Sequence, residues 1–360
     1  MSKRVSRSRL QIGAEQIALL ERLSNAGGVS GDEAAVRRIV IEEIEGVADS
    51  LKVDAMGSVL AVRHAQTEHA LRVMVAAHMD EVGFMLLEET DDGLFSFGLV
   101  GGIDPRQLPG KTVRVGPQRI PGVIGACPVH LSTEAERERV ISVESLRIDI
   151  GPSAAGRVEP GERAVFATDF RQVGPSLFGK ALDDRIGVAT LIELFKHAPP
   201  NVELLAAFTV QEEVGLRGAG PAADAFDPDL AIAIDCTPAY DHPNWDGSEN
   251  VRYNTRLDYG PAIYTVDRGT ISDRRLINHL RQIADLEGIP CQLRQPGGGG
   301  TDAGAIHVRR AGIPSVSISV PGRYMHTAVS MVRLKDWQHY AALLHAGLRL
   351  LPADILKDER

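Results

Sequence analysis

The sequence predicts an α/β protein, with a mixed sheet flanked by helices on both faces and a small all-β domain inserted into it. Two observations support this prediction. Apolar runs of strand length alternate with amphipathic helical segments over most of the chain, as in sheets that helices cover on both faces. Between about residues 84 and 172, short strand-like segments broken by Gly and Pro replace that alternation. At 360 residues, the chain is long enough for both parts.

The first part, residues 1–83, contains predicted helices at 15–23 and 32–44, predicted strands at 51–54 and 58–62, and a buried strand at 71–77. Ser30 and Asp32 offer capping side chains to the second helix. The inserted β domain, residues 84–172, contains short alternating segments and little helical periodicity apart from 134–140. Its expected strands are 84–87, 94–99, 112–115, 122–126, 146–150 and 163–166.

The last part, residues 173–360, continues the main sheet and forms one domain with residues 1–83. Its first helix, at 183–197, places Val188, Leu191 and Ile192 on one side at helical spacing. Strands and helices then alternate to the end of the chain. The expected strands are 202–210, 229–235, 290–294 and 314–320, and the expected helices are 216–224, 273–286, 302–309 and 332–350.

Composition narrows the functional classes. The net charge of −9 and the pI of about 5.7 disfavour a nucleic-acid-binding protein, which needs clustered basic residues. No stretch approaches the roughly 18 apolar residues of a membrane span, and the basic segment 1–9 leads into an amphipathic segment instead of a signal-peptide core. Cys127, Cys236 and Cys291 form no Cys-x-x-Cys pair, which is typical of buried thiols in a reducing compartment. We therefore expect a cytoplasmic protein without nucleic-acid or membrane partners.

Four apolar strands each lead into an acid or a histidine. These residues are His78 and Asp80 after 71–77, Glu212 and Glu213 after 202–210, Asp235 after 230–234, and His326 after 315–320. Ligands of open α/β sheets bind outside the carboxyl ends of the strands. Carboxylates and imidazoles gathered at such an edge are what a metal site needs. With Asp183 at the start of the helix at 183–197, the candidate metal ligands are His78, Asp183, Glu213, Asp235 and His326.

The charge of this set favours two metal ions over one. Two divalent cations carry +4, which three carboxylates and one bridging hydroxide balance, with one carboxylate shared between the metals. Such a pair, ~3.5–4 Å apart, can hold the substrate oxygen and the attacking water during hydrolysis. Nitrogen and oxygen ligands without thiolate suit Zn²⁺, Co²⁺ or Mn²⁺, and the sequence does not choose among them.

Glu212 and Glu213 are adjacent, and successive side chains on an extended backbone point to opposite sides. One of them can bind metal while the other acts as general base for a water bridging the metals. The alternative is a solvated acidic pair at a strand end. Asp80 lies on the same side of an extended segment as His78 and can accept its second ring N–H. The alternative for Asp80 is an ordinary turn aspartate.

Other candidates are assigned to ordinary roles. His130, His242 and His307 do not follow a long apolar strand, so surface or core positions are expected. Asp184 is assigned to the first turn of its helix, where negative charge is favourable. The glycine run 297–300, followed by Thr301 and Asp302, lacks the features of a phosphate-binding loop. It is expected to be a capped flexible turn or a backbone wall of a substrate pocket.

Four segments resemble the glutamyl/deblocking aminopeptidases, a family of dinuclear metallopeptidases that form tetrahedral particles and sometimes carry an endoglucanase label. The segments are His78-Met79-Asp80-Glu81-Val82-Gly83-Phe84, Gly179-Lys180-Ala181-Leu182-Asp183-Asp184-Arg185-Ile186-Gly187, Gln211-Glu212-Glu213-Val214-Gly215-Leu216-Arg217-Gly218-Ala219 and Gly298-Gly299-Gly300-Thr301-Asp302-Ala303. The resemblance extends from about residue 15 to 350, with the motifs in the family order. It implies a zinc-peptidase-like catalytic domain. It also implies that His78, Asp183 and Asp235 surround one metal while Asp183, Glu213 and His326 surround the other, with Asp183 bridging.

The resemblance further implies that Glu212 is the catalytic base and that Asp80 orients a ligand. The inserted domain would mediate subunit contacts in a homo-oligomer, commonly a dodecamer built from dimers. Two departures stand out: Asp184 replaces a frequent Asn, and residues 236–239 read Cys-Thr-Pro-Ala where the family often has Val-Thr-His/Ala. The second departure lies near the metal site, so substrate preference does not transfer from the family.

A dinuclear metallo-aminopeptidase is the leading hypothesis, and three others compete with it. A glycoside hydrolase uses two carboxylates about 5–9.5 Å apart and has no use for His78 and His326. A metal-dependent deacylase or dipeptidase acting on a small amide would use the same five ligands. A non-catalytic assembly protein would be indicated by a missing ligand or base, and none is missing.

Overall fold

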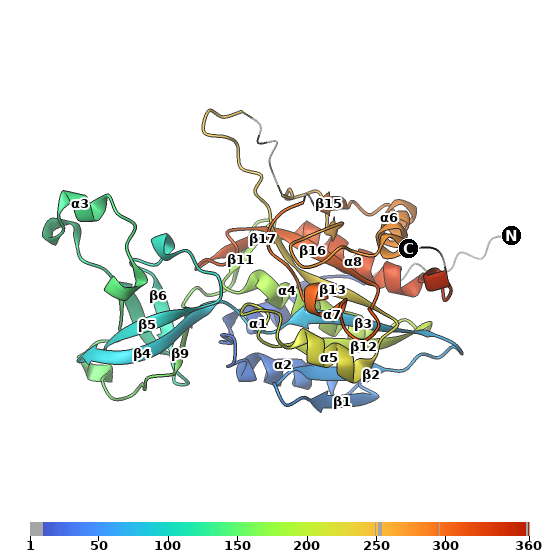
Figure 1. The fold of residues 1–360 in the computed structure, drawn as a ribbon, viewed down its shortest axis with the longest axis horizontal. Helices are drawn as coiled ribbons and strands as arrows, with labels where there is room; N and C mark the ends of the chain where they lie inside the picture. Colours follow the sequence, from blue (N-terminus) through green and yellow to red (C-terminus); the bar gives the residue numbers. More distant parts are fainter. Residues whose placement is uncertain (1–9, 249, 251–253, 295, 358, 360) are drawn as a thin grey trace.

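The computed structural model describes residues 10–248, 250, 254–294, 296–357 and 359. The basic segment 1–9 considered above lies outside the described residues. Figure 1 shows two parts, a large α/β part and a smaller β part beside it. Within the described residues, no helix has the length and apolar character that crossing a bilayer requires.

The large part is built on one mixed sheet, which contains eleven strands among the described residues. Along the sheet the order is β1 (Ser50–Val53), β2 (Val59–Arg63), β12 (Val202–Thr209), β3 (Leu71–His78), β13 (Leu230–Pro238), β16 (Ser315–Arg323), β17 (Ser330–Arg333), β11 (Ser176–Gly179) and β10 (Arg171–Val173). Two further strands, β14 (Ala262–Tyr264) and β15 (Gln292–Arg294), join beside β16.

The four central strands β12, β3, β13 and β16 run parallel to one another. Thr209 at the end of β12 lies opposite His78 at the end of β3, and Asp235 in β13 lies opposite Ser319 in β16. The carboxyl ends of these strands therefore meet at one edge, where ligands of such sheets bind.

Helices cover both faces of the sheet, which confirms the predicted fold class. One face packs against α1 (Ala14–Asn25), α2 (Ala34–Ile44), α4 (Leu182–Lys196), α6 (Arg274–Glu287) and α8 (Leu334–Arg349), and the other against α5 (Ala219–Phe226) and α7 (Ala303–Ile306). Side chains of a strand alternate between faces. In β3, Val73 and Val75 belong to the first core, whereas Met74 and Ala76 belong to the second. Burial on both faces explains why these strands read as continuous apolar runs.

The smaller part is a closed β-barrel with its own core. Around the barrel the order is β4 (Gly83–Asp91), β5 (Leu94–Val100), β8 (Arg147–Asp149), β7 (Ile120–Gly125), β6 (Thr112–Val115) and β9 (Arg163–Phe166). Phe84 packs edge-on against Phe97 and Phe166, with ring centroids 5.3 Å and 5.1 Å away. Helix α3 (Glu134–Arg137) lies in the excursion between β7 and β8. Short 3-10 helices lie at Pro105–Gln107, Val129–Leu131, Val143–Ser145, Pro152–Ala154 and Ile355–Lys357.

Several elements differ from the predictions. The helix predicted at 216–224 begins at Ala219, because a turn with Gln211 and Leu216 at positive φ precedes it. The helix predicted at 302–309 ends at Ile306, and the one at 134–140 spans four residues. Strands β10, β11, β14 and β17, each of three or four residues, were not predicted. The boundaries at 84 and 172 remain a prediction, and β10 of the main sheet spans the second of them.

Candidate metal centre

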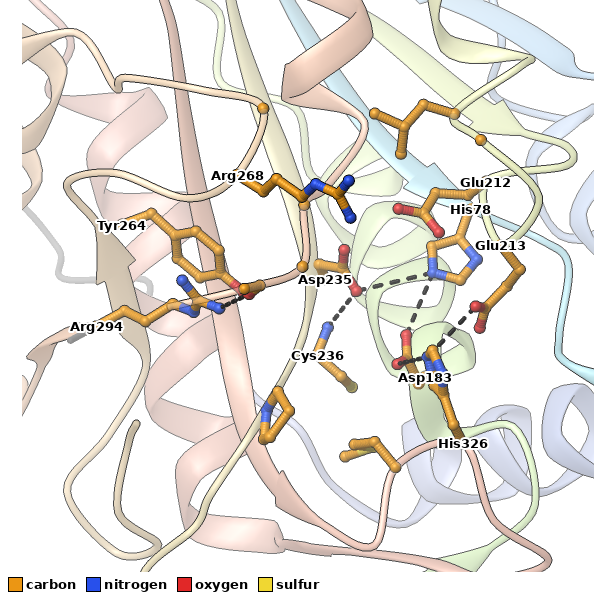
Figure 2. A pocket seen from close by; sticks show the side chains of 18 residues that line it. His78, Asp183, Glu212, Glu213, Asp235, Cys236, Tyr264, Arg268, Arg294 and His326 are labelled. Carbon is orange, nitrogen blue, oxygen red and sulfur yellow. Dashed lines mark hydrogen bonds and ion pairs between the residues drawn. The ribbon is translucent and has the colours of Figure 1, made fainter. Parts of the chain in front are cut away.

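The five candidate ligands and Glu212 line one cavity of about 880 Å³ at the carboxyl edge of the central strands (Figure 2). They come from five different places in the sequence. The remaining lining residues are Gly215, Leu216, Cys236, Pro238, Tyr264, Arg268, Gly269, Arg294, Gly298, Gly299, Gly300 and Met325. The glycine run thus contributes to a pocket wall, as one of its two interpretations predicts.

Asp183 lies between the two histidines. Its Oδ1 is 3.2 Å from His78 Nε2, and its Oδ2 is 3.5 Å from His326 Nε2. The same nitrogen of His78 is 3.7 Å from Asp235 Oδ1, and the same nitrogen of His326 is 3.3 Å from Glu213 Oε2. The two oxygens of Asp183 therefore face two different groups of donors.

Local backbone structure sets these positions. Asp183 lies in the first turn of α4, where it and Asp184 have non-helical backbone angles and are joined by a cis peptide bond. Asp235 lies inside β13, which continues to Pro238, so the prediction that it follows the strand was wrong by a few residues. His326 has a φ of 59°, and its Nδ1 is 2.9 Å from the carbonyl oxygen of Gly102, in the segment after β5 of the barrel.

Asp80 connects two parts of the site. Its Oδ1 lies 3.4 Å from His78 Nδ1, on the side of the ring opposite Asp183. Its carboxylate also accepts hydrogen bonds from the backbone N–H groups of Glu212 and Glu213, at 3.0 and 3.1 Å, and from the Ser30 hydroxyl at 2.6 Å. Asp80 therefore faces the imidazole of His78 and holds the turn that carries both glutamates.

That turn differs from the extended backbone on which the prediction for the glutamates relied. Gln211 has a φ of 58°, and the carbonyl oxygen of Glu212 accepts the N–H groups of Gly215 and Leu216, each at 2.9 Å. The chain is therefore folded back at Glu212. The two side chains nonetheless have different contacts: Glu213 faces His326, whereas no hydrogen bond or ion pair among the described residues engages the Glu212 carboxylate.

A second cluster of charged side chains, centred on Glu81, is buried directly behind the site. Glu81 accepts hydrogen bonds from Lys180 Nζ at 2.8 and 2.9 Å, from Arg185 Nη2 at 3.0 Å and from the Gly28 N–H at 3.0 Å. All three charged side chains are at most 2% exposed. Arg185 also donates to the Asp80 carbonyl at 3.1 Å, so this network fixes the backbone that follows His78.

The ligand cluster itself has an excess of negative charge. Burial, followed by the charge of Asp183, raises the pKa of Asp235 to about 7. Burial also raises the pKa of Glu213 to about 8 and holds the pKa of Glu212 well above its ordinary value. Burial disfavours the charged form of His326, but its hydrogen bond with Asp183 and the charge of Glu213 raise its pKa to about 10. Carboxylates crowded together in a buried site shift in this direction.

These residues fit a divalent metal centre. Two groups of three side chains each place one donor atom per residue within 4.8 Å of one another: His78, Asp184 and Asp235, and His78, Asp183 and Glu213. Imidazole nitrogens and carboxylate oxygens without thiolate suit Zn²⁺, Co²⁺ or Mn²⁺. A cation would also favour the charged form of these carboxylates, which burial and their mutual repulsion disfavour.

Asp184 lies closer to the site than the sequence analysis expected. Its Oδ1 does accept the N–H of Gly187 at 3.0 Å, in agreement with a role in the first helical turn. A Cβ at Gly187 would lie only 2.3 Å from the Asp184 carboxylate oxygens, so a larger residue there would displace this carboxylate. However, Asp184 is fully buried and belongs to one of the candidate ligand groups. Its position beside Asp183 was the available signal.

The three histidines assigned to ordinary roles remain outside the cavity lining. His130 lies on the exposed excursion of the barrel, and His307, directly after α7, has its Nδ1 2.8 Å from the carbonyl oxygen of Ala303 in that helix. His242 Nε2 is 3.4 Å from the Tyr324 hydroxyl. Sequence reasoning missed Arg268 and Arg294, which do line the cavity.

Comparisons with known proteins agree over nearly the whole chain. The model of the M42 glutamyl aminopeptidase family matches residues 57–343. The chain is 36% identical to a putative aminopeptidase of Acetivibrio thermocellus, over 91% of this chain and 96% of that protein. It is 32% identical to the lysyl aminopeptidase of Pyrococcus furiosus, over 93% of this chain and 98% of that protein.

Solved structures that are similar to this chain include the following three. A TET aminopeptidase from a marine sediment archaeon of the Thaumarchaeota has a TM-score of 0.89 and 33% identity, covering 96% of this chain and 99% of that one. The TET1 peptidase of Pyrococcus horikoshii is described as assembling into a tetrahedron or a large octahedral shell. It has a TM-score of 0.82 and 36% identity, and the match covers 93% of this chain and 100% of that one. A Thermotoga maritima structure named endoglucanase has a TM-score of 0.74 and 32% identity, and the match covers 91% of this chain and 95% of that one.

Proposed function

Because the chain belongs to the M42 glutamyl aminopeptidase family, and is thereby a peptide hydrolase, we propose that it is a dinuclear metal-dependent aminopeptidase. It would hydrolyse the first peptide bond of peptides and release the amino-terminal residue. The observation that carries the proposal is that two histidines and three carboxylates converge on one cavity, with Asp183 facing both histidines.

The proposed ligands divide into two groups that share Asp183. His78, Asp183 and Asp235 would hold one metal ion, and Asp183, Glu213 and His326 the other. The different partners of the two Asp183 oxygens support this division. When bound, such a pair of divalent cations polarises the scissile carbonyl and makes a water more acidic. Zn²⁺, Co²⁺ and Mn²⁺ all suit the donor set.

Glu212 is the proposed general base. It would take a proton from the attacking water at a carboxylate oxygen and deliver it to the leaving amine. Its position on the cavity wall, without an ion-pair partner among the described residues, supports this role. Asp80 would act as a positioning residue, because it faces His78 Nδ1 and accepts the N–H groups of both glutamates.

The main alternative is a metal-dependent deacylase or dipeptidase, which the same ligands would serve. Enzyme stripped of metal and reloaded with Zn²⁺, Co²⁺ or Mn²⁺ would be assayed on aminoacyl p-nitroanilides, N-acetyl amino acids, dipeptides and a β-glucan. We expect turnover of the aminoacyl anilides. Hydrolysis of only the N-acetyl amino acids or only the dipeptides would favour the alternative, and β-glucan hydrolysis that survives chelation would favour a glycoside hydrolase.

We also propose a homo-oligomer, a dodecamer built from dimers, in which the β-barrel provides subunit contacts. The described assembly of the similar TET1 peptidase and a further TET1 structure that is a dodecamer support this proposal. The proposed location is the cytoplasm, in keeping with three free cysteines. Light scattering of the metal-loaded protein tests the assembly, and a monomer at micromolar concentration would contradict it.

A further inference from the structure

A buried aspartate behind the cavity wall has no role in the proposed mechanism. Asp302 follows the glycine run and Thr301, and it is only 3% exposed. Its Oδ2 is 2.5 Å from the hydroxyl oxygen of Thr209, whereas its Oδ1 is buried and has no hydrogen-bond partner among the described residues. Burial raises the pKa of Asp302 to about 6, although the Thr209 hydrogen bond lowers it. Such a carboxyl costs stability, because burying a polar atom without a partner is unfavourable.

The ordinary role of an aspartate at this position does not apply to Asp302. The residue precedes α7, where an aspartate side chain often accepts an N–H of the first helical turn. Asp302 makes no such hydrogen bond, and the N–H of Ala303 is bonded by the Thr301 hydroxyl at 3.3 Å instead. The same hydroxyl is 2.7 Å from that of Ser317 in β16. Thr301 therefore anchors the end of the glycine run, and the carboxyl of Asp302 requires another explanation.

The contact with Thr209 connects Asp302 to the segment that carries Glu212. Thr209 ends β12, three residues before Glu212. Its hydroxyl oxygen is also 3.2 Å from the carbonyl oxygen of Ala77, so it joins the carboxyl ends of β12 and β3. Asp80 holds the turn itself, through the N–H of Glu212 at 3.0 Å. The turn is therefore supported by one aspartate directly and by the other through the strand that leads into it.

Asp302 also acts on Glu212 through its charge. Burial, and then the charges of Asp235 and Asp302, hold the pKa of Glu212 well above its ordinary value. Like charges in a buried site have this effect on each other. The carboxyl of Asp302 is therefore coupled to Glu212 both mechanically and electrostatically.

We propose that Asp302, acting through Thr209, positions Glu212 for proton transfer in the hydrolytic reaction. Both are positioning residues, because neither lines the cavity. The inference rests on the proposed function, since it takes Glu212 as the general base. It also gives the segment 298–303 a second role besides forming a pocket wall.

Other roles for the pair predict other effects. If the pair served stability alone, its loss would ease unfolding and leave kcat per folded molecule unchanged. If it oriented His78, which lies opposite Thr209 in the sheet, its loss would lower the metal content. Positioning of Glu212 predicts a lower kcat, with KM, metal content and stability close to those of the wild type.

The experiment compares full-length wild-type, Asp302→Asn, Thr209→Val and Thr209→Ser proteins, each reloaded with the same metal. In Asp302→Asn we expect kcat on an aminoacyl p-nitroanilide to fall about 10- to 100-fold with little change in KM or metal content, the scale of a small misplacement at an active site. Its urea midpoint should not fall, because the substitution removes a buried charge. Thr209→Val should also lower kcat, and Thr209→Ser should restore most of it by keeping the hydroxyl.

Thr190→Val is the matched control for the loss of a buried hydroxyl. Thr190 lies in α4, outside the cavity lining, where its hydroxyl donates to the Ile186 carbonyl at 2.7 Å and accepts from Trp337 Nε1 at 2.8 Å. This substitution should lower the urea midpoint and leave kcat unchanged. A kcat loss in Thr190→Val as large as that in Thr209→Val would contradict a specific role for the pair.

A double variant shows whether Asp302 acts through the base. Added to Glu212→Gln, the Asp302→Asn substitution should lower kcat by no more than about twofold, because residues that act as a unit have non-additive effects. The inference is wrong if Asp302→Asn lowers kcat by the same factor in both backgrounds, or if Asp302→Asn alone keeps the wild-type kcat.

Failure of the proposed function would look different. It is indicated if no aminoacyl p-nitroanilide is hydrolysed, or if Glu212→Gln keeps the wild-type kcat. Crystal structures of the wild type and Asp302→Asn then test the inference without turnover. A displaced Glu212 carboxylate in the variant would support positioning by Asp302, and an unchanged one would overturn it.

Discussion

Two buried charged networks meet at the end of β3, and they are balanced in opposite ways. Behind the strand, Glu81 is surrounded by Lys180 and Arg185, so the protein supplies its own cations. In front of it, Asp183, Glu213 and Asp235 crowd around two histidines, and burial raises the pKa values of two of these carboxyls. The segment 78–81 joins the two networks, because His78 belongs to the front one and Glu81 to the rear one.

This difference separates a structural network from a functional one. A buried charge is tolerated when it is paired and hydrogen-bonded. The Glu81 network meets that condition with protein groups alone, and it holds the backbone on which His78 and Asp80 lie. The cluster in front has more carboxylates than histidines, so the metal ions of the proposed function would complete it. Four experiments test this difference between the two networks.

The largest effect is expected from metal removal. Prolonged chelation should abolish activity, because only the front network depends on an external cation, and added Zn²⁺, Co²⁺ or Mn²⁺ should restore it. Activity and metal content by elemental analysis are the measurements. Circular dichroism serves as the control, since the Glu81 network should keep the stripped protein folded. A fully active, metal-free protein would refute the metal centre.

Next in size is the substitution of the two adjacent glutamates. Glu212→Gln keeps the metals but removes the proton acceptor, so kcat should fall about 10²- to 10⁴-fold, the usual worth of general base catalysis. Glu213→Gln removes a charge from the ligand set, so it should lower metal occupancy and be partly rescued by added metal. Turnover and metal content are measured for both. Metal loss in Glu212→Gln alone would mean that the two roles are reversed.

A third experiment tests the rear network through stability. Lys180→Met leaves Glu81 with Arg185 as its remaining cationic partner, so it should destabilise the fold by about 3 kcal/mol, the scale on which a buried pair is broken. Lys196→Met is the matched control, because Lys196 pairs with Glu43 at a partly exposed site, where pairs are worth about 0–1 kcal/mol. Urea unfolding at fixed protein and metal concentration gives both values. Equal stabilities for the two variants would contradict the importance of the rear network.

The smallest effect is expected where Asp80 supports a ligand from behind. Asp80→Asn should reduce metal affinity or activity about 10- to 100-fold, the usual cost of losing a group that orients a ligand. Asp54→Asn is the control: Asp54 accepts the N–H groups of Met56, Gly57 and Ser58 in a turn outside the cavity lining. Metal titration of both variants, followed by activity, measures the difference between them. If they behave alike, Asp80 is only a turn aspartate.

The sequence predicted the front network better than the surrounding structure. His78, Asp235 and Glu213 could be identified because long apolar strands precede or contain them, and parallel strands bring such residues to one edge. Positive φ usually falls on glycine, and Gln211 is a non-glycine residue with positive φ. The sequence therefore gave no signal for the turn that carries the glutamates, and that segment was predicted to be extended.

The missed residues have weak local signals. Arg294 ends the short strand β15, and a lone arginine is usually exposed, so its burial had no signal in the sequence. Asp184 was explained by its helix turn, and only the tertiary packing shows its burial. Short strands such as β10 and β17 depend on their sheet partners rather than on their own residues.

The inserted barrel also affects how the chain can fold. Pairing His78 with Thr209 requires closing a loop of about 130 residues, and the entropic cost of closure grows with the logarithm of loop length. In the barrel, however, Phe84 pairs with Ala164, so once it has formed, most of that loop is already closed. The remaining closure then costs roughly 1 kcal/mol less on this scaling. If the barrel forms first, the effective contact order of the central sheet is lower, and we expect substitutions in the barrel core, far from the metal centre, to slow assembly of the sheet.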